Sequence, residues 1–200
     1  MLKIIKPERA ERILAEFEPL IAGLSERYRF PSELLQAVLF REMTMTDVLD
    51  PAADLVVAAG IFPKKDSSTG FGQVFGRTAI NAINAAVAAG LTGFAALGLP
   101  ERILDADDPH DVRKVWLKLW LEPAFNIEAA ALTLLDAARQ MTGRRDFDSF
   151  SEEELKLILT RYNSDTRTVS AYGQAVYEDY LSRVKKRDRT AIRPAAKHVE

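Results

Sequence analysis

Hydrophobic residues recur at helical spacing along most of the chain, and this pattern predicts an all-α protein. Residues 7–27 carry apolar side chains along one side and predict a first helix. A second apolar stripe begins at residue 34 and ends at Glu42. Strand patterns are almost missing, so we expect at most a short hairpin near 62–75. The remaining helices are predicted over residues 50–59, 76–89, 110–121, 126–141, 151–161 and 168–184.

Local start signals support several of these helices. Asp108 stands directly before a proline, which is the order of an N-cap followed by the first helical residue. Ser151 and Glu154 have the spacing of a capping box. The helical interpretation therefore rests on end signals as well as on periodicity.

Glu42 is the residue with the clearest candidate chemistry. It follows Val38 by four residues and Leu35 by seven, so it shares the apolar face of its helix. A carboxyl group held against apolar neighbours resists ionisation and keeps its proton near neutral pH, as a general acid requires. The alternative is a Glu42 that turns toward solvent or pairs with a cation such as Arg41.

The composition is that of a globular protein. The 200 residues are 48% hydrophobic and 28% charged, and they fit one domain, which we place at residues 1–184. From residue 185 the chain is basic and then rich in alanine and proline, so residues 185–200 are interpreted as a flexible tail.

Several functional classes are disfavoured by what the chain lacks. Cysteine is absent, which excludes disulfides, thiolate nucleophiles and cysteine-ligated zinc, and with only two histidines we predict no metal and no cofactor. The net charge of −2 does not indicate a nucleic-acid partner. Residues 79–99 are apolar but are interrupted by glycine, asparagine and threonine, so no membrane span is expected.

Beyond Glu42, four short motifs follow one another along the chain: Ser68-x-Gly70-x-x-Gln73, Asn126-Ile127, Tyr162-Asn163 and Tyr172-x-x-x-Val176. Each motif is short, and it is their shared order that is informative. A helix ending in glutamate followed by these motifs resembles the lysozyme-like superfamily, especially soluble lytic transglycosylases and goose-type lysozymes. The resemblance covers roughly residues 30–182 and implies an enzyme that cleaves the glycan strands of bacterial peptidoglycan.

The resemblance implies that Glu42 is the catalytic acid. A lytic transglycosylase needs only this carboxylate, whereas a hydrolase needs a second one to activate or position water. Asp66 is the preferred second carboxylate because it precedes the Ser-Ser-Thr-Gly loop, although a turn-capping role explains it equally well. Nearer in the chain to Glu42 are the alternatives Asp47, Asp50 and Asp54.

The same resemblance implies a set of substrate-binding residues. For two of them a structural role is an alternative: Asn126 as a helix N-cap, and Tyr162 as a core tyrosine with a satisfied hydroxyl. The set consists of Ser68, Gly70, Gln73, Asn126, Tyr162 and Asn163.

Departures from the family pattern keep other functions open. Ser164 stands where the family has a glycine after Tyr-Asn, which puts one wall of the cleft in question. The main rival is therefore a lysozyme-like helical scaffold without activity, acting as a binding or structural protein. A third hypothesis is binding of nucleic acid or an anionic surface through the basic residues 183–197.

The start of the chain lacks the uninterrupted apolar core of a secretory signal peptide, although peptidoglycan lies outside the cytoplasm. We therefore expect action in the periplasm or cell wall after delivery, as an antibacterial effector or toxin or as a phage lysis enzyme. If the protein is a toxin, an immunity protein that blocks the cleft is an expected partner.

Overall fold

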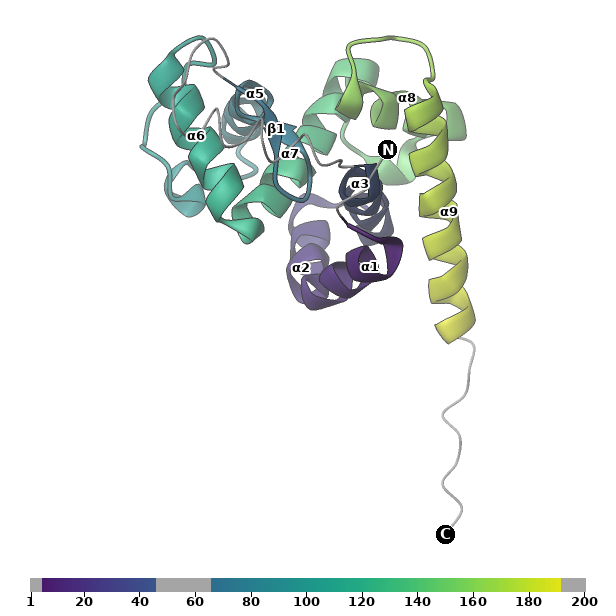
Figure 1. The fold of residues 1–200 in the computed structure, drawn as a ribbon. Helices are drawn as coiled ribbons and strands as arrows, with labels where there is room; N and C mark the ends of the chain where they lie inside the picture. Colours follow the sequence, from purple (N-terminus) through teal and green to yellow (C-terminus); the bar gives the residue numbers. More distant parts are fainter. Residues whose placement is uncertain (1–4, 46–65, 192–200) are drawn as a thin grey trace.

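The computed structural model describes residues 5–45 and 66–191, and these are mostly helical, which confirms the all-α prediction (Figure 1). A short hairpin, β1 (Ser68–Thr69) with β2 (Val74–Phe75), falls inside the expected range. The helices are α1 (Pro7–Glu16), α2 (Glu18–Tyr28), α3 (Ser32–Met45), α5 (Gly76–Ala88), α6 (Pro109–Leu121), α7 (Pro123–Thr142), α8 (Glu152–Asn163) and α9 (Ala171–Ala191), with 3₁₀ turns η1 (Ala95–Leu97) and η2 (Phe147–Ser149).

The helix α3 is the centre of the fold. It packs against α1, α2, α7 and α9, and apolar side chains on most of its sides are buried. Leu34, Leu35 and Val38 are completely buried. A helix with apolar residues around most of its circumference is stable only when other elements surround it, as they do here. Glu42 is therefore carried by a helix that offers its side chains little water.

The long helix α7 joins two sides of the molecule. In Figure 1, α5 and α6 lie on one side of it, and α8 and α9 lie on the other. Contacts agree with this view, because α7 packs against α5, α6 and α8, while α9 packs against α8 and α3. The hairpin contacts α5, α6 and α7, so it belongs to the α5 side.

Three predicted helix ranges are wrong: 7–27, 126–141 and 168–184, of which the last is observed as α9 from Ala171 to Ala191. Residues 7–27 form α1 and α2 instead of one helix, with a break at Phe17. Pro19 lies in the first turn of α2, where its missing N–H is tolerated, whereas inside a continuous helix it would remove a backbone hydrogen bond. The predicted helix over 126–141 begins earlier, because Pro123 occupies the first turn of α7.

Two other predictions concern residues at or beyond the ends of the described ranges. The helix expected over 50–59 lies outside them, as do Asp47, Asp50 and Asp54. The helix α9 continues to Ala191, so the first residues of the predicted tail at 185–200 are helical.

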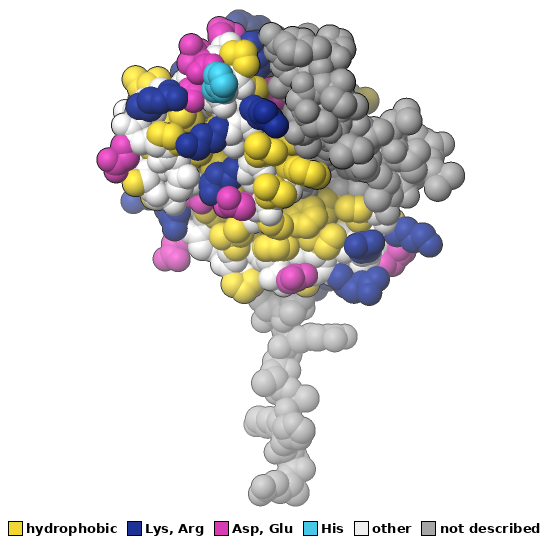
Figure 2. Space-filling model, turned by 60° about the vertical axis from the view of Figure 1, so that its left-hand side comes forward, with side chains coloured by type: hydrophobic (Ala, Val, Ile, Leu, Met, Phe, Trp, Pro, Cys, Tyr) yellow, Lys and Arg dark blue, Asp and Glu magenta, His cyan; other side chains and the backbone are white. Residues whose placement is uncertain are grey.

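The outer surface of the α6 side mixes apolar and charged side chains. Figure 2 turns this side forward and shows hydrophobic side chains lying among acidic and basic ones. Large exposed apolar residues include Ile103, Trp120 and Leu121, and the Trp120 ring stacks on Trp116 with 5.6 Å between centroids. Within residues 5–45 and 66–191, no helix combines the length and the apolar character needed to cross a membrane.

Candidate active site

Glu42 lies in the last turn of α3 and is only 9% exposed. Burial raises the pKa of its carboxyl group from 4.5 to about 7. The Tyr172 hydroxyl from α9 donates a hydrogen bond to Glu42 Oε1, which favours the ionised form and partly opposes the effect of burial. At neutral pH a large share of Glu42 therefore keeps its proton.

Two tyrosines from the C-terminal helices lie close to Glu42. Burial and the negative charge of Glu42 both raise the pKa values of Tyr162 and Tyr172 well above 10.0. Both phenols therefore stay protonated and act as hydrogen-bond donors. The Tyr162 hydroxyl donates to the Gly72 carbonyl at 2.7 Å, which ties α8 to the turn of the hairpin.

The position of Tyr172 depends on a close approach between α8 and α9 at Gly173. A Cβ atom at Gly173 would lie 2.1 Å from Thr160 Oγ1 and 2.6 Å from the Lys156 carbonyl oxygen. Only glycine allows the two helix backbones to come this near. The sequence analysis assigned no role to Gly173, although it directly follows the motif tyrosine.

Arg41, the residue before Glu42 on α3, binds α9 at two further points. Its guanidinium group forms an ion pair with Asp179 at 2.6 Å and donates to the Ala175 carbonyl oxygen at 3.1 Å, both on α9. These two contacts fasten α9 to α3.

The turn between β1 and β2 is shaped by the predicted Ser-x-Gly-x-x-Gln motif. Gly70 has φ +71°, and a Cβ atom there would lie 2.1 Å from Asn126 Nδ2. Gln73 also has a positive φ of 45°, a conformation that side-chain-bearing residues rarely adopt. Its amide group donates to the Gly70 carbonyl at 3.0 Å, and the Ser68 hydroxyl donates to Gln73 Oε1 at 3.1 Å. The motif residues thus stabilise their own turn.

Asn126 holds this turn from α7. Its Oδ1 accepts a hydrogen bond from the Gly72 amide at 2.7 Å, and its Nδ2 donates to the Thr69 carbonyl at 2.9 Å and to the Leu119 carbonyl at 3.3 Å. The N-cap of α7 is Glu122, so the interpretation of Asn126 as an N-cap is wrong. Asn126 lies inside the helix, completely buried, and its amide bonds to the hairpin backbone.

Asp66 stabilises the start of α5. Its Oδ1 accepts from the Gly76 amide at 2.8 Å, and its Oδ2 accepts from the Arg77 amide at 3.0 Å. Burial raises the pKa of Asp66, while these backbone hydrogen bonds oppose that shift. This geometry matches the capping alternative, and Asp66 as a second catalytic carboxylate stays a prediction.

A cleft of about 580 Å³ opens beside Glu42. Its walls come from the hairpin and α5 on one side and from the end of α8 on the other, with α3 and α7 contributing between them. Gly70, Asn126 and Asp66 support its walls without lining it. The predicted site residues that line the cleft are Glu42, Ser68, Gln73, Tyr162 and Asn163.

The wall after Tyr162-Asn163 does not require the glycine of the family pattern. Ser164 has φ −154° and ψ 163°, which is extended backbone open to any residue. Its amide donates to the Thr160 carbonyl at 3.0 Å and closes the end of α8. The departure in sequence therefore leaves this wall without backbone strain.

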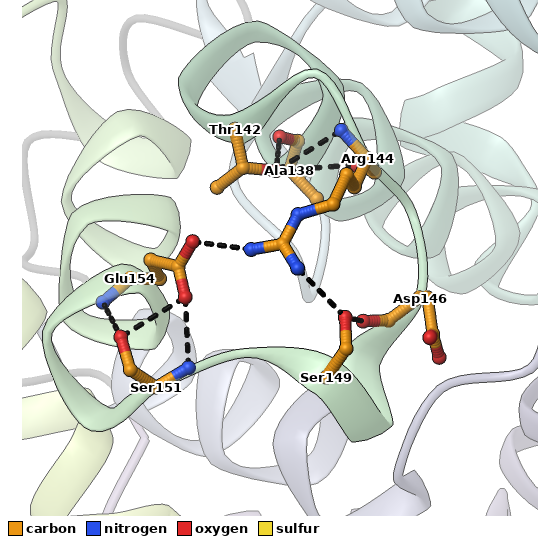
Figure 3. A network of polar contacts seen from close by, with 7 residues as sticks. All are labelled: Ala138, Thr142, Arg144, Asp146, Ser149, Ser151 and Glu154. Carbon is orange, nitrogen blue, oxygen red and sulfur yellow. Dashed lines mark hydrogen bonds and ion pairs between the residues drawn. The ribbon is translucent and has the colours of Figure 1, made fainter.

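The connection between α7 and α8 fixes the relative position of two cleft walls (Figure 3). Arg144 pairs with Glu154 and donates to Ser149 Oγ at 3.1 Å. The Ser151 amide donates to Glu154 Oε2 at 2.9 Å, which is half of the capping box and lowers the pKa of Glu154. The predicted capping box at Ser151 and Glu154 is confirmed.

Several polar residues of the cleft were missed by the sequence analysis. A signal for the α7 residues exists, because Asn126, Thr133 and Gln140 are seven residues apart and so share one helix face. Their presence in an alanine-rich helix marks this face as polar. The missed lining residues include Phe75, Arg77, Thr133, Asp136, Gln140 and Arg161.

Comparisons with known proteins add no family to this chain. It matches no protein-family model, no curated protein and no solved structure. Among the described side chains, no group of three or more His, Cys, Asp or Glu residues is placed to hold a metal ion. The resemblance to the lysozyme-like superfamily stays a prediction, and the case for a function depends on the chemistry of the cleft.

Proposed function

We propose that this protein cleaves the glycan strands of peptidoglycan, with Glu42 acting first as general acid and then as general base. The observation that carries the proposal is a carboxyl group whose pKa is about 7 and that lines an open cleft. Acids poised near the working pH are the most effective proton donors. A buried glutamate with only a structural role has no need of such an opening.

Glycoside cleavage requires a proton on the leaving oxygen while positive charge develops at the sugar carbon. Glu42 supplies this proton and becomes a carboxylate, which the hydrogen bond from Tyr172 stabilises. The carboxylate then accepts a proton from a hydroxyl of the same sugar, which closes an anhydro ring. In a hydrolase it would accept the proton from water instead.

Other described carboxylates near the cleft are already bound by protein groups, which supports the transglycosylase reaction, in which Glu42 acts alone. Asp66 accepts hydrogen bonds from the α5 backbone. Asp136 is bound by Arg139 and Gln140. Since both of these buried or half-buried acids are held by other groups, we favour a lytic transglycosylase over a hydrolase.

The cleft also offers surface for a sugar ring. Phe75 lines it and is 47% exposed, so its ring is available to a ligand. Aromatic rings pack against the apolar faces of sugars, while Gln73 provides both hydrogen-bond donors and acceptors. These groups complement a glycan strand, which has both apolar ring faces and hydroxyl edges.

The test is digestion of purified peptidoglycan by the wild type and by Glu42→Gln, with the released fragments identified by mass spectrometry. Anhydro ends that disappear with the substitution are the expected result. Reducing ends would indicate a hydrolase. Glu33→Gln is the matched control, because Glu33 is a buried glutamate of the same helix that does not line the cleft.

Absence of fragments from a folded wild type, across peptidoglycans of several kinds, would overturn the proposal. That outcome would favour the rival reading of the chain as a helical scaffold that binds a partner without cleaving it.

A further inference from the structure

Arg161 lies near the end of α8 and lines the same cleft as Glu42. Its Nε donates to Gln140 Oε1 at 2.8 Å, and its Nη1 donates to the Ser164 carbonyl oxygen at 3.3 Å. These two bonds hold the guanidinium plane in place from α7 and from the end of α8. A planar cation that is already oriented loses little entropy when it binds a further group.

A buried carboxylate of the same cleft, Asp136, is bound by groups other than Arg161. Asp136 accepts from Arg139 at 2.9 Å and from the Gln140 amide at 2.6 Å, so its charge is balanced within α7. Gln140 thus orients Arg161 by its carbonyl oxygen while its amide group binds Asp136. This side of the cleft therefore presents the oriented guanidinium group of Arg161, while the charge of Asp136 is already balanced by Arg139.

The ion-pair partner of Arg161 is easily replaced. Asp165 lies just beyond the end of α8 and pairs with Arg161, but the Asp165 side chain is 93% exposed while that of Arg161 is 27% exposed. Ion pairs with such an exposed member are weak, because water competes for the carboxylate. A carboxylate delivered by a ligand bound in the cleft replaces Asp165 at little cost.

We infer that Arg161 binds a carboxylate of the glycan ligand and so makes the cleft select acidic, peptidoglycan-type strands over neutral ones. This inference rests on the proposed function. Guanidinium groups bind carboxylates through paired hydrogen bonds, which fix position as well as charge. The carboxylate has two sources in such strands: the stem peptide, or the lactyl group of the sugar once the peptide is removed.

The test measures binding by proteins that carry Glu42→Gln, so that no ligand is consumed. The ligands are glycan strands with stem peptides, strands stripped of them, and neutral N-acetylglucosamine oligomers. Adding Arg161→Gln is expected to raise the Kd for an acidic strand by about tenfold and to leave the Kd for the neutral oligomer unchanged. Adding Arg161→Lys, which keeps the charge but loses the planar fork, should recover only part of the loss.

Arg9→Gln is the matched control, because Arg9 is exposed on α1 and does not line the cleft. It removes the same charge and should change none of the three Kd values. Dependence on Arg161 for stem-bearing strands alone identifies the stem carboxylates, and dependence that persists for stripped strands identifies the lactyl group. Equal Kd values with and without Arg161 for every acidic strand would overturn the inference.

The outcomes separate this inference from the proposed reaction. Cleavage of peptidoglycan by the wild type, together with binding that ignores Arg161, overturns the carboxylate site and leaves the reaction intact. Binding that depends on Arg161 without any cleavage overturns the reaction and leaves the carboxylate site. Failure of all three ligands to bind a folded protein overturns the inference as well as the glycan specificity.

Discussion

Glu42 and Asp66 are two acids near one cleft that the fold treats in opposite ways. Burial raises the pKa of both. The Asp66 oxygens accept hydrogen bonds from the Gly76 and Arg77 amides at the start of α5, and these bonds favour the ionised form. Tyr172 is the hydrogen-bond partner that lowers the Glu42 pKa, and burial still raises it to about 7.

The difference comes from where each acid lies relative to helix ends. The start of a helix presents several unpaired amides and a partial positive charge, so an acid there gains hydrogen bonds that favour its ionised form and oppose the effect of burial. Glu42 lies in the final turn of a buried helix, where backbone amides are already paired along the helix, and its side chain is largely withdrawn from water. Asp66 therefore accepts hydrogen bonds from backbone amides, whereas Glu42 keeps a proton that it can donate.

The largest expected effect is on activity. Glu42→Gln should reduce glycan cleavage by about a hundred- to ten-thousand-fold, because the amide N–H groups are not acidic enough to transfer a proton. Asp66→Asn should change the rate much less, since its carboxylate bonds to backbone. Turnover numbers on one peptidoglycan preparation compare the two. Equal losses for both variants would contradict the distinction between the acids.

The second effect is on the pH dependence of stability. A native pKa of about 7 against 4.5 means that the folded state holds more protons than the unfolded state between these values. Stability from this group is therefore full below pH 4.5 and falls as pH rises through 7, by about 3 kcal/mol in total. Denaturant unfolding of the wild type and Glu42→Gln at pH 5 and pH 8 measures it. The free-energy difference between the two proteins should change with pH in this direction.

The contact that positions Tyr172 provides a third test. Gly173→Ala should destabilise the protein by about 1–3 kcal/mol, because its Cβ would overlap Thr160 and the Lys156 backbone. Gly23→Ala is the control: Gly23 lies within α2, and a Cβ there meets nothing within 4 Å. Urea unfolding should show the control to be neutral or stabilising. Equal effects from both would mean that α8 and α9 are not closely packed at Gly173.

Tyr172→Phe should have a smaller effect, which is on the pH dependence of the cleavage rate. The hydrogen bond from Tyr172 lowers the pKa of Glu42, so its loss should raise that pKa further. Because catalysis needs protonated Glu42, the alkaline limb of the pH–rate profile should move upward, by about one pH unit. A downward shift of this limb would show that the phenol does not stabilise the carboxylate.

The smallest effect is expected from Asp66→Asn on stability. The substitution keeps an acceptor oxygen but removes the charge at the start of α5, so a loss of about 1 kcal/mol is expected. Thermal unfolding compared with the wild type measures it. A stabilised variant would mean that the burial of the Asp66 carboxylate outweighs its hydrogen bonds to the helix.

Periodicity and short motifs predicted much of the fold and part of the site. Helical spacing placed Glu42 on a buried face, and local start signals located the capping box at Ser151 and the cap at Asp108. These features depend on residues a few positions apart, so a single sequence contains them. The break between α1 and α2 at Phe17 could also have been predicted from the sequence, because Pro19 favours a helix start there.

The rest depends on contacts between helices far apart in the chain. The partnership of Tyr172 with Glu42 spans 130 residues, and no local pattern fixes it. Gly173 appears unremarkable until α8 is known to lie against it. The role of Arg161 likewise requires the position of Gln140 on a neighbouring helix.

The most direct test of the account is the titration of the Glu42 carboxyl group. Carbon NMR on protein labelled at glutamate, with Glu42→Gln to assign the signal, gives its pKa. We expect a midpoint of about 7, because burial of the side chain disfavours its ionised form. A midpoint near 4.5 would show that Glu42 is an ordinary anion at neutral pH and would contradict its role as the proton donor.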